Sequence, residues 1–273
     1  MKKLFSLLGI KLSRFEKLLS KIGVYKLYEK LLSYQIEGGP IPEHIALILD
    51  GNRRWARKRS LDPWIGHEYG ADRVEEVLKW CLELGVKTLT IYAFSTENFR
   101  RSKKEVEELM KILEEKFRSA LKNPEIHKHK VRVKAIGKID LLPESVKEAI
   151  REVEEATKEY NEHYLNIGVA YGGRAEIVDA TRRIAEEVKH GKIKPEDINE
   201  KVFEKYLYTS HLPKPDPDLI IRTSGEERLS GFLLWQCAYS ELCFLDVYWP
   251  DFRKIDLLRA IRTYQRRSRR FGK

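Results

Sequence analysis

The sequence predicts an α/β fold, a single domain with a mainly parallel central sheet of about six strands flanked by helices. Short apolar runs alternate with amphipathic helical patterns between residues 45 and 247. Alternation of this kind is typical of parallel sheets with helices on both faces. Several of the runs are continuously apolar, as strands buried on both faces are. The 273 residues and their 42% hydrophobic content are enough for one large core.

Six apolar runs are the candidate strands, and five helical patterns alternate with them. The strands are expected at 45–49, 88–94, 131–137, 165–171, 219–222 and near 243–247. The helices are expected at 71–84, 103–121, 143–163, 175–190 and 200–207. Short apolar runs suit strands, whereas longer stretches with a period near 3.6 residues suit helices.

Residues 1–40 are predicted to form a basic amphipathic extension, separate from a catalytic domain at 41–273. Residues 1–34 contain eight basic and two acidic residues, and their apolar residues recur at helical spacing: Phe15, Leu18, Leu19, Ile22 and Tyr25, then Tyr28, Leu31 and Leu32. Gly38, Gly39 and Pro40 then mark a boundary. Such a helix either lies on an anionic membrane or packs on the protein itself or a partner subunit.

The net charge of +10 favours an anionic partner, which is a nucleic acid, an acidic lipid surface or a phosphorylated metabolite. The three cysteines, Cys81, Cys237 and Cys243, form no Cys-x-x-Cys pair, which argues for reduced thiols and against a structural zinc site. No apolar run reaches the roughly 18 residues that a membrane span needs. We therefore expect a cytoplasmic protein, with peripheral membrane contact through residues 1–34 as an open alternative.

The most informative segment follows the first strand. The apolar run 45–49 is followed by polar and aromatic residues in the order Asp50, Gly51, Asn52, Arg53, Arg54 and Trp55. Open α/β sheets bind ligands at the carboxyl ends of their strands. Free backbone N–H groups and arginines hold phosphate there, and a carboxylate beside them suits a Mg²⁺ that bridges to the phosphate.

A second polar segment follows the strand at 88–94. Ser95 and Asn98 offer hydrogen bonds, and Arg101 offers a planar fork for phosphate. Taken alone, the segment also fits a plain helix start, because Ser102 and Glu105 have the spacing of a capping box. Two polar strand ends in succession favour a shared pocket over two independent caps.

Polar residues also lie at and after the end of the strand at 219–222. Arg222 and Arg228 lie six residues apart around a Ser-Gly turn, and Ser230 follows them. Two guanidinium forks suit a diphosphate, which has several anionic oxygens. Glu241, ten residues after Gly231, is a second candidate ligand for a hard cation, or else an exposed or salt-bridged glutamate.

Several functional signatures are absent from the sequence. It has no Gly-x-x-x-x-Gly-Lys-Ser/Thr loop, no Gly-x-Gly-x-x-Gly and no His-Glu-x-x-His. These absences argue against P-loop nucleotidases, dinucleotide-binding enzymes and zinc proteases. Asn52 stands where a phosphatase of the Asp-x-Asp type has its second aspartate.

Together these segments resemble the cis-prenyltransferases, the family of undecaprenyl diphosphate synthase and dehydrodolichyl diphosphate synthase. The resemblance covers about residues 44–252 and rests on three long motifs: Leu-Asp-Gly-Asn-Arg-Arg-Trp-Ala from Leu49, Tyr-Ala-Phe-Ser-Thr-Glu-Asn-Phe from Tyr92, and Ile-Arg-Thr-Ser-Gly-Glu-x-Arg-Leu-Ser from Ile221. Trp-Pro-Asp-Phe at 249–252 and Arg-Phe-Gly at 270–272 extend it. The paired arginines after Asn52 and the amphipathic extension resemble the archaeal and eukaryotic branch.

The resemblance implies a transferase that adds isopentenyl diphosphate repeatedly, in cis, to an allylic diphosphate, with Mg²⁺ as the cofactor. The starter is expected to be geranylgeranyl or farnesyl diphosphate, and the archaeal likeness favours geranylgeranyl. The product is expected to be a polyprenyl diphosphate of undecaprenyl size or longer, a precursor of a glycosyl carrier lipid. A homodimer is implied as well, because Arg270 and Gly272 would complete the partner's isopentenyl site. Nucleic acid is not an expected partner.

The resemblance also implies roles for particular residues. Asp50 would hold Mg²⁺, and Glu241 would complete the metal environment from the neighbouring subunit or orient the site. Asn98 matches a position often assigned to proton removal, but a carboxamide is a poor base, so we expect it to position the substrate. The other implied substrate-binding residues are Gly51, Asn52, Arg53, Arg54, Trp55, His67, Ser95, Thr96, Glu97, Phe99, Arg101, Arg222, Arg228, Leu229, Ser230, Arg270 and Gly272.

One position departs from the family pattern. Many relatives carry an arginine four residues before the histidine of the Gly-His pair at 66–67, where this chain has Pro63. Arg57 or Arg59 would supply the charge instead, or the phosphate clamp is weaker.

A growing prenyl chain needs an apolar tunnel, and the sequence offers candidate walls for one. They are Ala93 and the helical stripe Val106, Leu109, Met110, Leu113 and Phe117. Ordinary core packing explains the same stripe equally well.

Two other classes of protein compete with this interpretation. A non-catalytic partner subunit of the family would lack the catalytic aspartate and the phosphate arginines, whereas Asp50, Arg54, Arg222 and Arg228 are all present here. A nucleic-acid-binding protein would line its arginines along one face rather than cluster them at strand ends.

Overall fold

A computed structural model describes residues 23–267 of the chain. The contacts divide these residues into two compact units. One unit comprises residues 41–252, and the other comprises residues 23–40 together with 253–267. The predicted boundary near residue 40 between an extension and a catalytic domain remains a prediction, since residues 253–267 group with the N-terminal segment.

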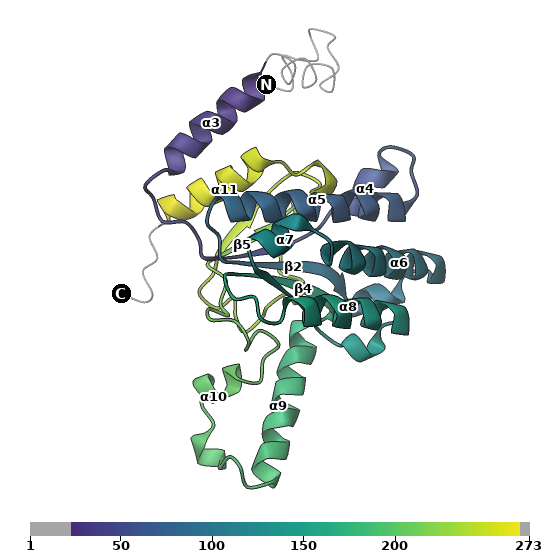
Figure 1. The fold of residues 1–273 in the computed structure, drawn as a ribbon, viewed down its shortest axis with the longest axis vertical. Helices are drawn as coiled ribbons and strands as arrows, with labels where there is room; N and C mark the ends of the chain where they lie inside the picture. Colours follow the sequence, from purple (N-terminus) through teal and green to yellow (C-terminus); the bar gives the residue numbers. More distant parts are fainter. Residues whose placement is uncertain (1–22, 268–273) are drawn as a thin grey trace. The chain divides into compact units, whose positions relative to one another are not determined.

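The larger unit is built on a single six-stranded sheet (Figure 1). The strands are β1 (His44–Ile48), β2 (Thr88–Ser95), β3 (Val131–Ile136), β4 (His163–Tyr171), β5 (Leu219–Arg222) and β6 (Glu241–Phe244). Their order across the sheet is β3-β4-β2-β1-β5-β6, and every neighbouring pair is parallel. The predicted parallel sheet of about six strands is therefore confirmed.

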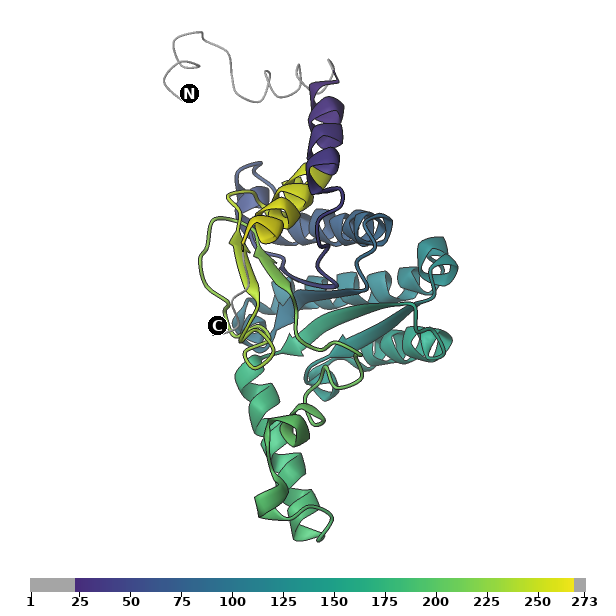
Figure 2. The same cartoon turned by 90° about the vertical axis from the view of Figure 1, so that its left-hand side faces the viewer.

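Helices connect the strands, as the alternating pattern predicted. They are α4 (Asn52–Arg57), α5 (Pro63–Glu83), α6 (Lys103–Ala120), α7 (Pro124–Lys128), α8 (Glu144–Thr157), α9 (Gly173–Lys189) and α10 (Glu200–Glu204). Short 3-10 helices lie at η1 (Thr96–Arg100), η2 (Ile139–Leu141), η3 (Pro195–Asp197) and η4 (Trp249–Asp251). Figures 1 and 2 show α9 extending away from the sheet with α10 beside it.

Several element boundaries differ from those that the sequence predicted, among them those of α5, α8 and β6. Helix α5 begins eight residues before the predicted position, at Pro63, whose fixed φ suits the first turn of a helix. Helix α8 ends at Thr157 rather than 163, because the chain must extend from His163 to pair with β3. Strand β6 begins at Glu241, which pairs with Leu219 of β5.

The two faces of the sheet have different roles. On one face, side chains of β2 and β4 such as Ile91 and Leu165 meet α5 and α6 around an apolar cavity. On the other face, Ile48, Tyr92 and Ile220 pack against Phe232 and Leu233, which lie in the segment before β6. Burial on both faces explains why β1 is continuously apolar from Ile45 to Ile48.

The smaller unit pairs α3 (Val24–Ile36) with α11 (Lys254–Arg266). Leu32 and Ile36 of α3 are buried, and the Tyr28 ring lies 5.0 Å from the Arg259 guanidinium. An apolar stripe of α3 is left exposed, formed by Val24, Leu27, Leu31 and Tyr34. The predicted stripe residues Phe15, Leu18, Leu19 and Ile22 lie outside the described residues. Within residues 23–267, the helices are all too short or too polar to cross a membrane.

Candidate active site

The three motifs that the sequence singled out meet at one edge of the sheet. Strand β1 lies between β2 and β5, and its last residue, Ile48, pairs with Tyr92 on one side and Arg222 on the other. The segments after these strands therefore leave the sheet side by side. Asp50 of the first motif and Arg222 of the third are in direct contact at this edge.

Asp50 lies between two arginines at this edge. Its Oδ2 accepts a hydrogen bond from Nη2 of Arg222 at 2.8 Å, and its Oδ1 lies 3.3 Å from Nη2 of Arg54. Burial alone would raise the pKa of Asp50, but hydrogen bonds from Arg222 and Ser224 and the charges of Arg222 and Arg54 hold this pKa below its usual value. Asp50 is therefore ionised at neutral pH, as a metal ligand must be.

The backbone around Asp50 is held from both sides. Thr223 donates its hydroxyl to the Asp50 carbonyl at 2.7 Å, and the N–H of Trp249 donates to the same carbonyl at 3.0 Å. Gly51 follows with φ +105°, and a Cβ there would come within 2.8 Å of the Tyr248 ring. Only glycine fits this turn, because both its conformation and the adjacent ring exclude a side chain.

A polar cleft of about 590 Å³ opens beside Asp50. Four arginines, Arg53, Arg54, Arg57 and Arg101, line it together with one carboxylate, that of Asp50. Its other lining residues are Leu49, Gly51, Asn52, Ser60, Leu61, Pro63 and His67. This excess of positive charge around backbone N–H groups at the start of α4 suits an anion with several oxygens.

The structure distinguishes the two arginines that the sequence offered in place of the family's arginine at Pro63. Arg57 lines the cleft beside Pro63. Arg59 instead lies 3.3 Å from the Asp251 carboxylate and stacks over the Trp55 ring at 4.1 Å. Arg57 is therefore the residue placed to supply the charge.

A buried glutamate organises the arginines on the far side of the cleft. Glu105 is 4% exposed, and its Oε1 atom accepts a hydrogen bond from Nη1 of Arg101 at 3.0 Å. The same oxygen forms an ion pair with Nε of Arg53 at 3.4 Å. His67 contacts the same Arg101 nitrogen through Nε2 at 3.2 Å. Burial, with the charges of Arg101 and Arg53, lowers the pKa of His67 to about 3. His67 is therefore neutral at physiological pH and acts as a hydrogen-bonding group.

The segment after β5 forms a second cationic cluster. Nη1 of Arg222 donates to the Ser230 hydroxyl at 2.8 Å and also to the Arg228 carbonyl. Ser224 and Ser230 both have positive φ values, +79° and +49°, which are uncommon for residues other than glycine. The Arg228 guanidinium is exposed and pairs with Glu226, and Leu229 packs against the core cluster on this face.

The loop after β2 is held by a capping box. The Oδ1 atom of Asn98 accepts from the Ser95 N–H at 3.0 Å, and the Ser95 side chain accepts from the Asn98 N–H in return. Thr96 donates to Glu97, and the Phe99 ring packs against Phe94 at 4.9 Å. The predicted helix start at Ser102 is also present, with its hydroxyl accepting from the Glu105 N–H at 3.3 Å.

Two predicted site residues lie apart from this cluster. Trp55 is buried, and its indole N–H donates to Asp251 at 2.7 Å. Glu241 pairs with Leu219 at the start of β6, the opposite end of the strands from Asp50, so the two carboxylates do not meet within one chain. Arg270 and Gly272 lie outside the described residues.

The residues present fit a Mg²⁺ that is shared with a substrate, and do not fit a protein-only metal cage. The described part of the chain contains no group of three or more acidic, histidine or cysteine side chains arranged to hold a metal. Mg²⁺ is commonly bound by one or two carboxylates together with substrate phosphates and water. Asp50, ionised and 27% exposed beside the cationic cleft, suits that second arrangement.

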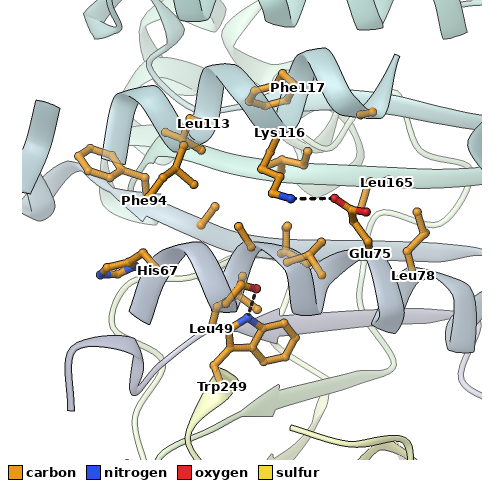
Figure 3. Close-up of a pocket in the computed structure, with 18 of the residues that line it drawn as sticks. Leu49, His67, Glu75, Leu78, Phe94, Leu113, Lys116, Phe117, Leu165 and Trp249 are labelled. Atoms are coloured by element: carbon orange, nitrogen blue, oxygen red, sulfur yellow. Dashed lines mark hydrogen bonds and ion pairs between the residues drawn. The ribbon is translucent and has the colours of Figure 1, made fainter. Parts of the chain in front are cut away.

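An apolar cavity adjoins the cleft on the α5–α6 face of the sheet (Figure 3). Leu49, Asn52 and His67 line both the cleft and the cavity. The cavity then runs between the two helices past Ala93, Leu109, Leu113 and Phe117. These are four of the six residues that the sequence offered as tunnel walls, whereas Val106 and Met110 are not among the lining residues.

Several residues of the site were not singled out as site residues from the sequence. Glu105 was seen only as a helix cap, although its spacing from Arg101 is that of an i, i+4 ion pair. Ser224 and Glu226 bind Arg54 at 2.6 Å and 2.9 Å. Their contacts depend on how the β5 segment folds over α4, for which the sequence carries no local signal.

Comparisons with known proteins agree with this geometry. A family model described as "Putative undecaprenyl diphosphate synthase" matches residues 48–272. A relative from Methanopyrus kandleri is 57% identical over 250 residues, 92% of each chain, and one from Methanocaldococcus jannaschii is 55% identical over 259 residues, 95% of this chain and 92% of its own. Both are named tritrans,polycis-undecaprenyl-diphosphate synthase (geranylgeranyl-diphosphate specific).

Solved structures give the same result. Lavandulyl diphosphate synthase from Lavandula x intermedia, crystallised with dimethylallyl diphosphate, aligns with a TM-score of 0.83 and 41% identity over 85% of this chain and 99% of its own. A probable undecaprenyl diphosphate synthase from Campylobacter jejuni aligns with a TM-score of 0.70 and 33% identity over 86% of this chain and 100% of its own. Fold, site and relatives thus define a prenyl-diphosphate transferase. The chain belongs to the cis-prenyltransferase family, as the motifs predicted.

Proposed function

We propose that the protein condenses isopentenyl diphosphate repeatedly, in cis, onto an allylic diphosphate and so makes a polyprenyl diphosphate of undecaprenyl size or longer. One observation carries the proposal: an ionised carboxylate, Asp50, lies between two arginine clusters where a cationic cleft meets an apolar cavity. The names of the archaeal relatives support geranylgeranyl diphosphate as the starter, with farnesyl diphosphate as the alternative. The product would serve as the precursor of a glycosyl carrier lipid.

The allylic diphosphate would bind in the cleft with its prenyl tail in the apolar cavity. Arg53, Arg54, Arg57 and the N–H groups at the start of α4 are placed for its phosphates. The tail would pass Leu49, Asn52 and His67, which line both spaces. The neutral state of His67 favours this arrangement, because an apolar chain would not have to desolvate a charge at the junction.

Isopentenyl diphosphate would bind the second cluster, formed by Arg222, Arg228 and Ser230. Arg222 already holds the Ser230 hydroxyl at 2.8 Å, and the exposed Arg228 guanidinium is free to turn from Glu226 toward a stronger anion. Because Arg222 also contacts Asp50, the two diphosphates would lie on either side of one carboxylate.

Magnesium would be held by Asp50 together with the allylic diphosphate, and would supply charge stabilisation for the departing diphosphate. The arginines of the cleft stabilise the same developing charge. The isopentenyl double bond attacks the allylic carbon as its C–O bond breaks, and a proton then leaves the new chain. The departing diphosphate or a water molecule accepts that proton, since Asn98 uses its Oδ1 atom for the capping box.

The proposed enzyme is a homodimer. In this family Arg270 and Gly272 would complete the isopentenyl site of the partner, and Glu241 would reach the partner's metal. The position of Glu241 at the opposite end of β6 from Asp50 supports a role across subunits rather than within one.

Peripheral contact with an anionic membrane is proposed for α3. Its exposed stripe (Val24, Leu27, Leu31 and Tyr34) is flanked by the exposed Lys26 and Lys30. A helix with an apolar stripe and basic flanks binds at the surface of anionic bilayers. Such contact suits an enzyme with a lipid product, because a long polyprenyl chain resides in a membrane.

Isopentenyl transfer is tested directly by incorporation of radiolabelled isopentenyl diphosphate with Mg²⁺ and each allylic starter. We expect incorporation with geranylgeranyl diphosphate, loss of incorporation on chelation, and its recovery on adding Mg²⁺. Asp50→Ala is expected to lower the rate by about 100-fold or more, because both the metal and the Arg222 contact lose their partner. The control is Asp140→Ala, at an exposed aspartate of η2. Absence of incorporation with every starter would refute the function.

Asn98→Ala separates a positioning role from proton transfer. Loss of a capping interaction costs about 1 kcal/mol of stability. Even if all of it raised the activation barrier, turnover would fall by less than roughly tenfold. Ser95→Ala removes the other half of the same capping box and is expected to cause a similar loss. A fall of about 10²–10⁴ for Asn98→Ala alone would indicate general base catalysis and contradict a positioning role.

Sedimentation in solution tests the dimer. Two chains of 32.1 kDa each should move as one particle at assay concentrations. A particle with the mass of a single chain under conditions that support turnover would rule out shared active sites.

Membrane contact is tested by co-sedimentation with vesicles. The protein is expected to bind vesicles rich in anionic phospholipid and to bind zwitterionic ones several-fold more weakly. Leu27→Ser combined with Leu31→Ser should abolish most of this binding, while Leu141→Ser, at an exposed leucine of η2, should not. Equal binding by the two variants would show that α3 is not the contact.

A further inference from the structure

An ion-pair cluster closes one side of the apolar cavity. Lys116 of α6 donates to Asp72 of α5, with Nζ 2.6 Å from Oδ1, and to Glu75 of α5, with Nζ 2.9 Å from Oε1. Figure 3 shows Lys116 and Glu75 reaching toward each other from the two helices, among apolar side chains. We call these three residues the α5–α6 latch. Lys116 and Glu75 are charged residues in an otherwise mainly apolar lining.

The latch lies partway along the cavity. Glu75 follows His67 by eight residues in α5, so it lies about 12 Å along the helix from the junction with the cleft. Leu78, Ile126 and Leu165 line the cavity farther along. A prenyl chain that grows from the cleft therefore reaches the latch before the end of the cavity.

The cavity is narrow. Its water-accessible volume is about 120 Å³, and a chain of undecaprenyl size has to be accommodated in it. The walls of the cavity must therefore move apart as the product lengthens. The α5–α6 side and the sheet side differ in how readily they separate.

The seam between α5 and α6 is the weaker wall. The opposite wall is formed by β2 and β4, which are joined by backbone hydrogen bonds. The helices meet through side chains, and the latch residues are partly open to water, with side-chain exposures of 27% for Lys116, 45% for Glu75 and 69% for Asp72. Ion pairs exposed to this degree contribute little to stability, so a growing chain can separate them.

We propose that the α5–α6 latch sets the length of the product. While it is closed, it keeps the apolar chain inside the cavity, because a chain that passed between Lys116 and the two carboxylates would strip water from three charges. Opening the latch therefore opposes each further addition, and elongation stops when the chain no longer presses the helices apart. This inference rests on the proposed polymerising activity and concerns where elongation stops.

Lys116→Met tests the latch by replacing the charged side chain with an unbranched apolar one that is one atom shorter. We expect the main product to become longer by one or more isoprene units, measured by chain-length analysis after dephosphorylation, because an apolar seam lets the chain pass. The matched control is Lys111→Met on the same helix, which removes an exposed pair with Glu108 that does not line the cavity. An unchanged or shorter product for Lys116→Met in a variant that still incorporates isopentenyl units would overturn the inference.

A charge exchange separates the ion pair from the side-chain shape. Lys116→Glu should place three carboxylates at the seam, and their mutual repulsion, by holding the helices apart, should lengthen the product. Adding Glu75→Lys should restore an attractive pair and bring the product back toward its original length. Failure of the double variant to shorten the product relative to Lys116→Glu would contradict the latch. Lack of any incorporation by the unmodified protein would instead refute the proposed function, so the two failures are distinguishable.

Discussion

The contact between Asp50 and Arg222 is the interaction on which the rest of the site depends. Arg222 is almost fully buried at the end of β5, and its charge would be uncompensated there without Asp50. Removing one partner of a buried ion pair costs roughly 3–5 kcal/mol, and less where one partner is partly open to water, as Asp50 is. The pair therefore joins the ends of β1 and β5 and also presents a carboxylate to the cleft.

The same contact explains why strained backbone persists beside it. Arg222 donates hydrogen bonds to the Ser230 hydroxyl and the Arg228 carbonyl, and Thr223 donates one to the Asp50 carbonyl. Left-handed conformations at Ser224 and Ser230 persist because these hydrogen bonds fix the loop and offset the cost of the strained backbone. A loop held in this way presents its hydroxyl and guanidinium groups without first having to order them, which favours binding of a second anion.

The strand ends were predictable from the sequence, and the contacts across them were not. Continuous apolar runs located β1 and β5, and the order of polar residues after them placed Asp50 and Arg222 at one edge. The partnership of Glu105 with Arg53 depends on where α6 docks. The distance of Glu241 from Asp50 depends on the register of β6, which begins two residues before the predicted strand. Local pattern carries no information on either.

The layout of the sheet explains how one site can bind diphosphates in a fixed place while the attached prenyl chain moves. The charged groups lie at the strand ends, where Asp50 anchors the clusters, and the apolar cavity extends along the α5–α6 face. In the proposed reaction the diphosphates return to the same arginines at each addition, while the chain already made must move away from them. The sheet is rigid on one side of that path, so the displacement falls on the helices. An exposed ion pair at Lys116 is then better suited to this place than a buried apolar contact, because it can part and re-form in water at each turnover.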